Sequence, residues 1–331
     1  QLQSTMLLMK ILLLSLLIIS QINSSEIIGK LDDRLDPIVT ETFGERLAQP
    51  TIIHTKIAQG IDILSCASVC GNILLISGPR GAVMVNTMLA KMHPWIKSVM
   101  RRNVGIDMPR IIISSNHHFW NADGNSLFGG QMHFMISQEN ARQSLLSSST
   151  LSNLNIIQDY YQVRHTDNAG ARVTFDDEMK LHFNKEDIYL YHFGSASSTG
   201  DTIIFFQGRN VLFLGDLYFS NALPYVNTVN GGSVKGIIKS LDESLQLIDD
   251  KTIVIPGIGT ASTKSELADY LKSLKELYQT VQELVDKNKS VTDILNDISV
   301  TNYLKTFSDN AISNKENFIN SIILELSLIH I

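Results

Sequence analysis

Residues 111–125 read Ile-Ile-Ile-Ser-Ser-Asn-His-His-Phe-Trp-Asn-Ala-Asp-Gly-Asn, and this stretch decides the fold. An unbroken run of β-branched residues is typical of a strand that is buried on both faces. The run leads directly into a loop with two adjacent histidines, and the loop closes on Gly124 and Asn125. The sequence therefore predicts a core strand that ends in a cluster of polar side chains.

Strands and helices follow one another on both sides of this stretch. Apolar runs predict strands near residues 61–65, 71–77, 82–85, 110–114, 174–183, 188–193, 202–206, 211–215 and 252–256. Helical spacing and capping boxes predict helices over 88–102, 138–146 and 231–248, and further helices that begin at 263, 290 and 313. Residues 147–158 are expected to form a loop or a flexible insertion. Strands followed by helices predict sheets that helices cover.

Four other segments stand out: Gln-Glu-Asn-Ala-Arg at 138–142, Gly-Ser-Ala-Ser-Ser-Thr-Gly-Asp at 194–201, Val-Leu-Phe-Leu-Gly-Asp at 211–216 and Val-Ile-Pro-Gly-Ile-Gly at 254–259. Together with Ser-Asn-His-His-Phe-Trp-Asn at 115–121, they resemble the motifs of the metallo-β-lactamase superfamily, in the same order. The resemblance spans roughly residues 58 to 285. It implies an α/β fold, the αββα metallo-β-lactamase-like sandwich, with extra C-terminal helices.

The same resemblance locates a candidate site. In the family, two zinc ions share seven side chains and convert a bound water into hydroxide. The matching positions here are Asn116, His118, Trp120, Asn121, Ser197, Asp216 and Ile258. Only His118 and Asp216 carry good zinc ligands, because amide and hydroxyl groups bind this ion poorly. The resemblance thus implies a remnant cleft without catalytic residues, in which no cofactor is expected; any metal would be held by His118 and Asp216.

Large apolar side chains at two of these positions support the interpretation that the cleft holds no metal. Trp120 and Ile258 place apolar groups where the family holds ions and water, so Trp120 is expected to fill the cleft; the alternative is a surface aromatic. A rebuilt single-metal site would need neighbours such as His117, Asp123, His192 or Asp201. Adjacent residues of an extended segment point to opposite sides, so His117 and His118 are not expected to share an ion.

The N-terminus carries a targeting pattern. Lys10 precedes an apolar run over residues 11–20, and small polar residues follow up to residue 25. This order predicts a signal peptide and a secreted or secretory-lumen protein, with an uncleaved anchor as the alternative. The predicted division is a leader over 1–25, the metallo-β-lactamase-like domain over 26–262, and a helical extension over 263–331 that packs on the domain or continues it.

Composition limits the partners. The net charge of −6 argues against nucleic-acid binding, which needs a concentrated basic surface. No membrane span is expected after removal of the leader, because the apolar run is about half the roughly 20 residues that a spanning helix needs. The two cysteines, Cys66 and Cys70, form a disulfide or remain two buried thiols, and their spacing is not a zinc motif.

Three functions remain open. The first is a secreted, catalytically inactive protein that binds a small molecule or a protein partner. The second is a metal-dependent hydrolase with a reduced zinc site. The third is a structural or assembly protein, supported only by the apolar C-terminal helix, which carries Ile322, Ile323, Leu324, Leu326 and Leu328. That helix docks on its own domain or on a second copy of the chain.

Overall fold

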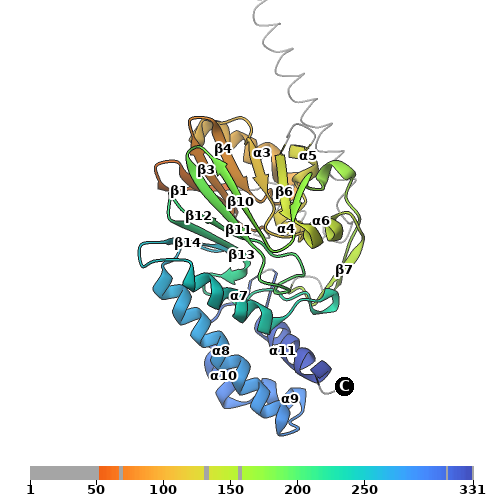
Figure 1. The fold of residues 1–331 in the computed structure, drawn as a ribbon. Coiled ribbons are helices and arrows are strands. Elements are labelled where there is room, and N and C mark those ends of the chain that lie inside the picture. Colours follow the sequence, from red (N-terminus) through yellow and green to blue (C-terminus); the bar gives the residue numbers. More distant parts are fainter. Residues whose placement is uncertain (1–51, 67–69, 130–133, 156–158, 311, 330–331) are drawn as a thin grey trace, which may run out of the picture.

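Two β-sheets face each other at the centre of the molecule, and helices cover the outer face of each (Figure 1). The computed structural model describes residues 52–66, 70–129, 134–155, 159–310 and 312–329. One apolar layer lies between the sheets, and one lies under the helices on each side. The predicted αββα sandwich is confirmed. The predicted leader over 1–25 lies outside the described residues.

The first sheet has seven strands in the order β1-β2-β3-β4-β5-β6-β9. Their bounds are Ile52–Ala58, Ile61–Cys66, Ile73–Gly78, Gly81–Val85, Ile111–Ile113, Phe134–Gln138 and Val173–Phe175. The first four strands form an antiparallel meander, whereas β4, β5, β6 and β9 run parallel. The carboxyl ends of β4 and β5 therefore meet at one edge of the sheet, which is where the site lies.

The second sheet has the order β10-β11-β12-β13-β14. Its strands span Glu178–Phe183, Glu186–Tyr191, Ile203–Phe206, Val211–Phe219 and Ile253–Ile258. All nine residues of β13 are buried, and β13 runs parallel to β14. The single strand predicted over 174–183 is wrong: β9 belongs to the first sheet and β10 to the second, because Asp176 and Asp177 form the turn between them.

Among the residues that the structure describes, only short helices lie on the side of the first sheet, whereas the three longest helices lie on the side of the second. On the first side lie α3 (His93–Val99), α4 (Phe119–Ala122), α5 (Asn125–Gly129) and α6 (Glu139–Leu145). The helix predicted over 88–102 is interrupted, since α3 starts afresh with Pro94 in its first turn and ends in a π-helical turn over Met100–Val104. On the second side lie α7 (Val234–Gln246), α8 (Lys264–Asp286), α9 (Val291–Leu295), α10 (Ile298–Leu304) and α11 (Lys315–Ile329).

Two of the three predicted capping boxes are confirmed. Capping boxes open α8 at Thr263 and α9 at Ser290. The predicted start at Ser313 is wrong by one residue, because the Asn314 side chain accepts the N–H of Asn317 at 2.8 Å. The Ser313 hydroxyl instead donates to the Pro224 carbonyl at 3.1 Å.

The C-terminal helices share one apolar layer with the second sheet. Leu212 of β13, Leu241 of α7, Leu271 of α8 and Ile319 of α11 all belong to it. Ile322 and Leu326 of α11 are buried there too, so α11 docks on the domain of its own chain. Within the described ranges, no helix is both long enough and apolar enough to cross a lipid bilayer.

Residues 149–152 pair with residues 159–162, so the loop predicted over 147–158 is wrong for its first part. Strands β7 (Ser149–Ser152) and β8 (Asp159–Gln162) form a separate two-stranded ribbon. Leu151 and Tyr160 are buried in the apolar layer that also holds Trp120. The ribbon therefore lies over the loop that follows β5.

Candidate functional site

The site forms where the loop after β5 meets β13, at the shared edge of the two sheets. This loop supplies Asn116, His118, Trp120 and Asn121, and β13 supplies Asp216. All five side chains are at most 1% exposed. The structure thus brings together five of the seven positions that the sequence singled out.

One carboxylate organises this cluster. Oδ2 of Asp216 accepts hydrogen bonds from four side chains: Asn116 Nδ2 at 2.8 Å, His118 Nδ1 at 2.7 Å, Trp120 Nε1 at 3.0 Å and Asn121 Nδ2 at 3.0 Å. A carboxylate can only accept, so Nδ1 of His118 carries the hydrogen. Among the described residues, Nε2 of His118 is buried without a hydrogen-bond partner.

The orientations of the asparagine amides follow from backbone donors, which can only donate. Oδ1 of Asn116 accepts the N–H of His118 at 3.1 Å, so its Nδ2 faces Asp216. Oδ1 of Asn86 accepts the N–H of Ser115 at 2.9 Å, so its Nδ2 donates to Asn121 Oδ1 at 3.2 Å. That leaves Asn121 Nδ2 for Asp216. The amide chain therefore aims N–H groups at the carboxylate.

These donors set the ionisation of the buried acids. Burial alone would raise the pKa of Asp216, but the hydrogen bonds from His118, Asn116 and Asn121 outweigh it, so the pKa lies below its ordinary value. Asp201 behaves oppositely: burial raises its pKa, although Asn116 Nδ2 and Ser198 donate to it. The pKa values of the two buried acids are thus shifted in opposite directions, and Asp216 is the stronger acid of the two.

Aromatic rings close the space around the carboxylate. The Trp120 ring lies 4.5 Å from the His118 ring and 5.4 Å from the Tyr225 ring, centroid to centroid. Trp120 has no exposed surface, so the prediction that it lies inside rather than on the surface is confirmed. The indole therefore fills the cleft with its ring and also donates to Asp216 through Nε1.

The remaining two predicted positions lie beside this network and do not join it. The Ser197 hydroxyl donates to the Tyr225 carbonyl at 2.8 Å. Ile258, at the end of β14, packs against the apolar layer that contains Trp120. Neither side chain hydrogen-bonds Asp216 in the described structure.

Several contributing residues were not found from the sequence. Asn86 and Tyr225 support the network, and Gln162 of the ribbon donates to the His117 carbonyl at 3.0 Å. The His117 and His118 rings do not point to opposite sides as an extended segment would place them, since they lie 4.9 Å from each other and the chain bends at His117. Asn86 was the one with a signal, because it is a polar residue directly after the buried strand β4, which neighbours β5.

Cys66 and Cys70 form a disulfide with their Cα atoms 6.1 Å apart, which decides between the two alternatives. The bridge ends next to Gly71, whose N–H donates to the Trp120 carbonyl at 3.1 Å. A side chain at Gly71 would collide with Oδ1 of Asn121, so only glycine lets this strand approach the site. The disulfide-bonded segment therefore packs directly against the cluster.

The residues present do not fit the zinc centre that the fold implies. Three of the four donors to Asp216 are amide or indole N–H groups, which cannot ligate a cation. His118 and Asp216 are hydrogen-bonded to each other. Across the described parts of the chain, no three His, Cys, Asp or Glu side chains lie close enough to hold a metal together.

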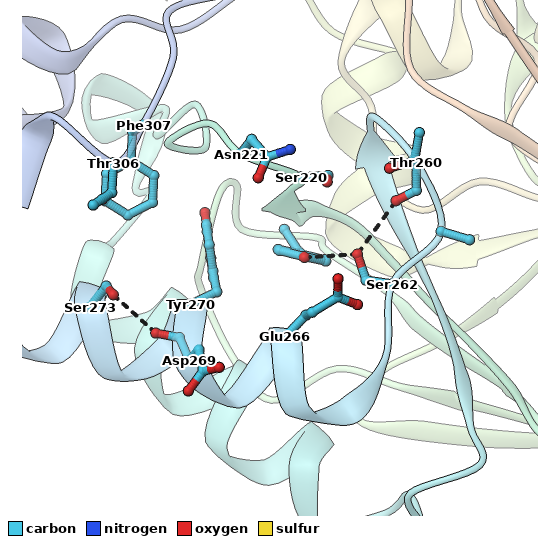
Figure 2. A pocket seen from close by; sticks show the side chains of 12 residues that line it. Ser220, Asn221, Thr260, Ser262, Glu266, Asp269, Tyr270, Ser273, Thr306 and Phe307 are labelled. Carbon is cyan, nitrogen blue, oxygen red and sulfur yellow. Dashed lines mark hydrogen bonds between the residues drawn. The ribbon is translucent and has the colours of Figure 1, made fainter.

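A separate polar hollow opens beside the ends of β13 and β14 (Figure 2). It has a volume of about 290 Å³ and is lined by hydroxyl and carboxyl groups, including Ser220, Ser262 and Glu266. Phe307, from the segment after α10, forms its far side. Asp216 and its four donors do not line this hollow.

Solved structures share the fold at low sequence identity. A metallo-β-lactamase from Pontibacter korlensis is 16% identical, with a TM-score of 0.55, over 68% of this chain and 99% of that one. A metallo-β-lactamase from Hirschia baltica is 13% identical, with a TM-score of 0.50, over 67% of this chain and 96% of that one. The resemblance predicted from the motifs is confirmed as a metallo-β-lactamase fold.

A third similar structure is the stereoselective inverting sec-alkylsulfatase from Pseudomonas sp.. It is 11% identical, with a TM-score of 0.60, and the match covers 83% of this chain but only 50% of the sulfatase. No protein-family model matches this chain, and neither does any curated protein sequence. At these sequence identities, the similarity shows the fold and not the activity.

Proposed function

We propose that this chain, which has the metallo-β-lactamase fold, is a catalytically inactive protein that binds a small molecule or a protein partner. One observation carries the proposal: Asp216 accepts four side-chain N–H groups from the loop over 116–121, so donors stand where cations would. A zinc ion at this place would have to displace these donors and the Trp120 indole. Under this proposal, the function of the protein requires no metal cofactor.

The chemistry that the site lacks follows from this arrangement. Hydrolysis by this fold requires a water whose pKa a metal lowers to about 7, from about 15.7 in bulk water. The ionised Asp216 carboxylate is already surrounded by donors, so it is a weak base for activating water. His118 has one ring nitrogen left, and the Trp120 and Tyr225 rings cover it on two sides.

We also propose that the protein is exported. The leader pattern over residues 1–25 and the disulfide between Cys66 and Cys70 support this, because disulfides persist mainly in oxidising compartments. N-terminal sequencing of secreted material should find a start near Ser24 to Ile28. An intact leader on a cytosolic protein would contradict the proposal.

The test of inactivity compares the wild type with a variant in which the zinc ligands are restored. This variant carries Asn116→His, Trp120→Asp, Asn121→His, Ser197→His and Ile258→His. The wild type should turn over no lactam, thioester, phosphodiester or alkyl sulfate substrate. The restored variant should gain zinc, because the substitutions return imidazole and carboxylate ligands to the chain. Zinc-dependent turnover by the wild type, lost in His118→Ala, would instead support a hydrolase with a reduced metal site.

A further inference from the structure

A large apolar cavity lies at the edge of the sandwich opposite to the Asp216 cluster. Its volume is about 720 Å³, within the about 300–1,000 Å³ of typical small-molecule sites. Its walls come from the segment before β5, from the starts of β5 and β6, and from the end of β10. The apolar residues among them are Ile106, Met108, Pro109, Ile111, Phe134, Ile136, Leu181 and Phe183.

The cavity is an open margin of the layer between the two sheets. Ile136 belongs to that layer, and Ile111, Leu181 and Phe183 pack against it. The parallel strands β5 and β6 begin here, whereas the Asp216 cluster follows the carboxyl end of β5. The two places are therefore on opposite edges of the same sheet, and the cavity is distinct from the remnant site.

Apolar surface at this cavity remains in contact with water. The Phe134 side chain at the start of β6 is 56% exposed, although phenylalanine is usually buried. Exposed apolar surface that continues into a concave pocket is typical of ligand sites, since covering it gains hydrophobic free energy. The walls therefore suit an aliphatic chain or a ring system.

Two arginines give the cavity a positive end. Arg110 lines it, and the Arg80 guanidinium lies 5.1 Å from the ring centroid of Phe183. In the part of the chain that the structure describes, neither guanidinium has an ion pair. The other charged groups nearby are paired: Asp107 with Arg101, and Asp187 with Lys180. The cavity thus combines an apolar interior with unpaired positive charge.

We propose that this cavity binds a free amphipathic anion, in which an apolar chain enters between the sheets and a carboxylate or sulfate head meets Arg110. Guanidinium groups bind such oxyanions through paired, charge-assisted hydrogen bonds. The proposal names a ligand class for the binding role, but it stands on the cavity alone. Zinc-dependent activity at Asp216 would leave it untouched.

The experiment is calorimetric titration of the mature full-length protein with decanoate and with the matching primary alcohol. Decanoate should bind saturably with one site per chain, and more tightly than the alcohol. Arg110→Gln should weaken the binding of decanoate at least about fivefold and leave the affinity for the alcohol unchanged. Phe134→Ala should weaken the binding of both ligands by a similar factor, because it removes apolar surface from the cavity and no charge.

Matched controls lie elsewhere on the surface. Tyr161→Ala removes an aromatic ring of similar exposure, 53%, on β8, and Arg102→Gln removes an exposed arginine that does not line the cavity. Neither change should alter binding. Thermal unfolding of each variant confirms that it is folded, which Phe134→Ala should be because this side chain is largely outside the core.

Three results would overturn the proposal. The first is no saturable binding of decanoate. The second is binding that Phe134→Ala and Arg110→Gln leave unchanged, or equal affinity for the alcohol. The third is binding only to vesicles of anionic phosphatidylglycerol, because this would assign the patch to a membrane surface and not to a free ligand.

Discussion

At the scale of single residues, a buried carboxylate needs hydrogen-bond donors around it. In this protein the donors are side-chain N–H groups. Taking an ionised aspartate out of water costs several kcal/mol unless hydrogen bonds replace the water. Asp216 obtains four such bonds from a loop of six residues. Trp120 is the main replacement, since it contributes both apolar volume and an N–H donor. The buried charge is therefore balanced by hydrogen bonds from within the protein.

Substitution of Asp216 should show graded losses of stability. Asp216→Asn keeps one oxygen for the donors and loses the charge, so it should lower the free energy of unfolding by about 1–2 kcal/mol. Asp216→Leu leaves buried donors without an acceptor and should cost about 3–5 kcal/mol. Urea denaturation measures both. Asp250→Asn, on an exposed carboxylate, should change little. Equal stability of wild type and Asp216→Leu would refute the role of the network.

His117 should make the protein sensitive to mild acid. Burial, followed by the neighbouring His118 and His165, lowers the pKa of His117 well below its ordinary value. His117 takes up a proton below about pH 6.5 in the unfolded chain but not in the folded chain. The contribution of His117 to the free energy of unfolding is therefore complete above about pH 6.5 and falls as the pH drops.

The free energy of unfolding, measured from about pH 7 to pH 5, should therefore fall less steeply in His117→Gln than in the wild type. His182→Gln, at an exposed histidine, serves as the control and should keep the wild-type slope. Identical slopes for wild type and His117→Gln would contradict this account.

The sequence located the site better than it described it. Motif order placed Asn116, His118, Trp120, Asn121 and Asp216 together, and the structure has them within hydrogen-bonding distance. The supporting contacts could not be predicted, because Tyr225 and Gln162 act through long-range packing that no local pattern encodes. Which amide hydrogen faces the carboxylate depends on backbone donors elsewhere in the fold.

At the scale of helices and strands, the predictions from sequence were wrong where the local sequence pattern was weak. The ribbon over 149–162 has strands of only four residues, rich in serine and polar groups, so its pairing has no strong signature. Its order comes from tertiary contacts: the Tyr225 hydroxyl donates to the Ser152 carbonyl at 2.9 Å, and Asn317 of α11 donates to the Asn153 carbonyl at 2.7 Å. Long amphipathic helices with capping boxes, such as α8, were predicted well.

One carboxylate adds polar contacts to the apolar docking of α11. Glu325 accepts from the Val234 N–H at 2.7 Å and from the Ser233 hydroxyl at 3.0 Å, at the start of α7. Glu325→Gln should lower the free energy of unfolding by about 1 kcal/mol, because a negative charge stabilises a helix N-terminus. Glu178→Gln, at an exposed position on β10 and away from any helix N-terminus, should change little.

A second measurement separates charge from packing. Burial, and then the charge of Glu325, raise the pKa of Tyr278 to about 12. Spectrophotometric titration of Glu325→Gln should find a lower pKa for Tyr278. An unchanged pKa together with unchanged stability would show that this contact does not hold α11 in place.

At the scale of the whole molecule, the sandwich has one closed edge and one open edge. The edge that is catalytic in zinc hydrolases of this fold is filled by Trp120, while the opposite edge has the apolar cavity bounded by Phe134 and Arg110. Three apolar layers and the C-terminal helices hold the fold together. None of these contacts requires an ion.

Removal of metal should therefore leave the stability of the fold unchanged. Ligands that bind the folded state raise its stability, so a metal-dependent fold would lose stability in a strong chelator. Thermal unfolding with and without the chelator should give the same midpoint within error. A drop of many degrees would contradict the filled-cleft interpretation.

The central claim is that hydrogen-bond donors have replaced zinc around Asp216. Its most direct test is the zinc content of the purified mature protein, measured by elemental mass spectrometry after dialysis against buffer with added zinc. The account predicts much less than one equivalent per chain, and no further loss in His118→Ala. One or two tightly held equivalents, reduced by His118→Ala or Asp216→Asn, would contradict it.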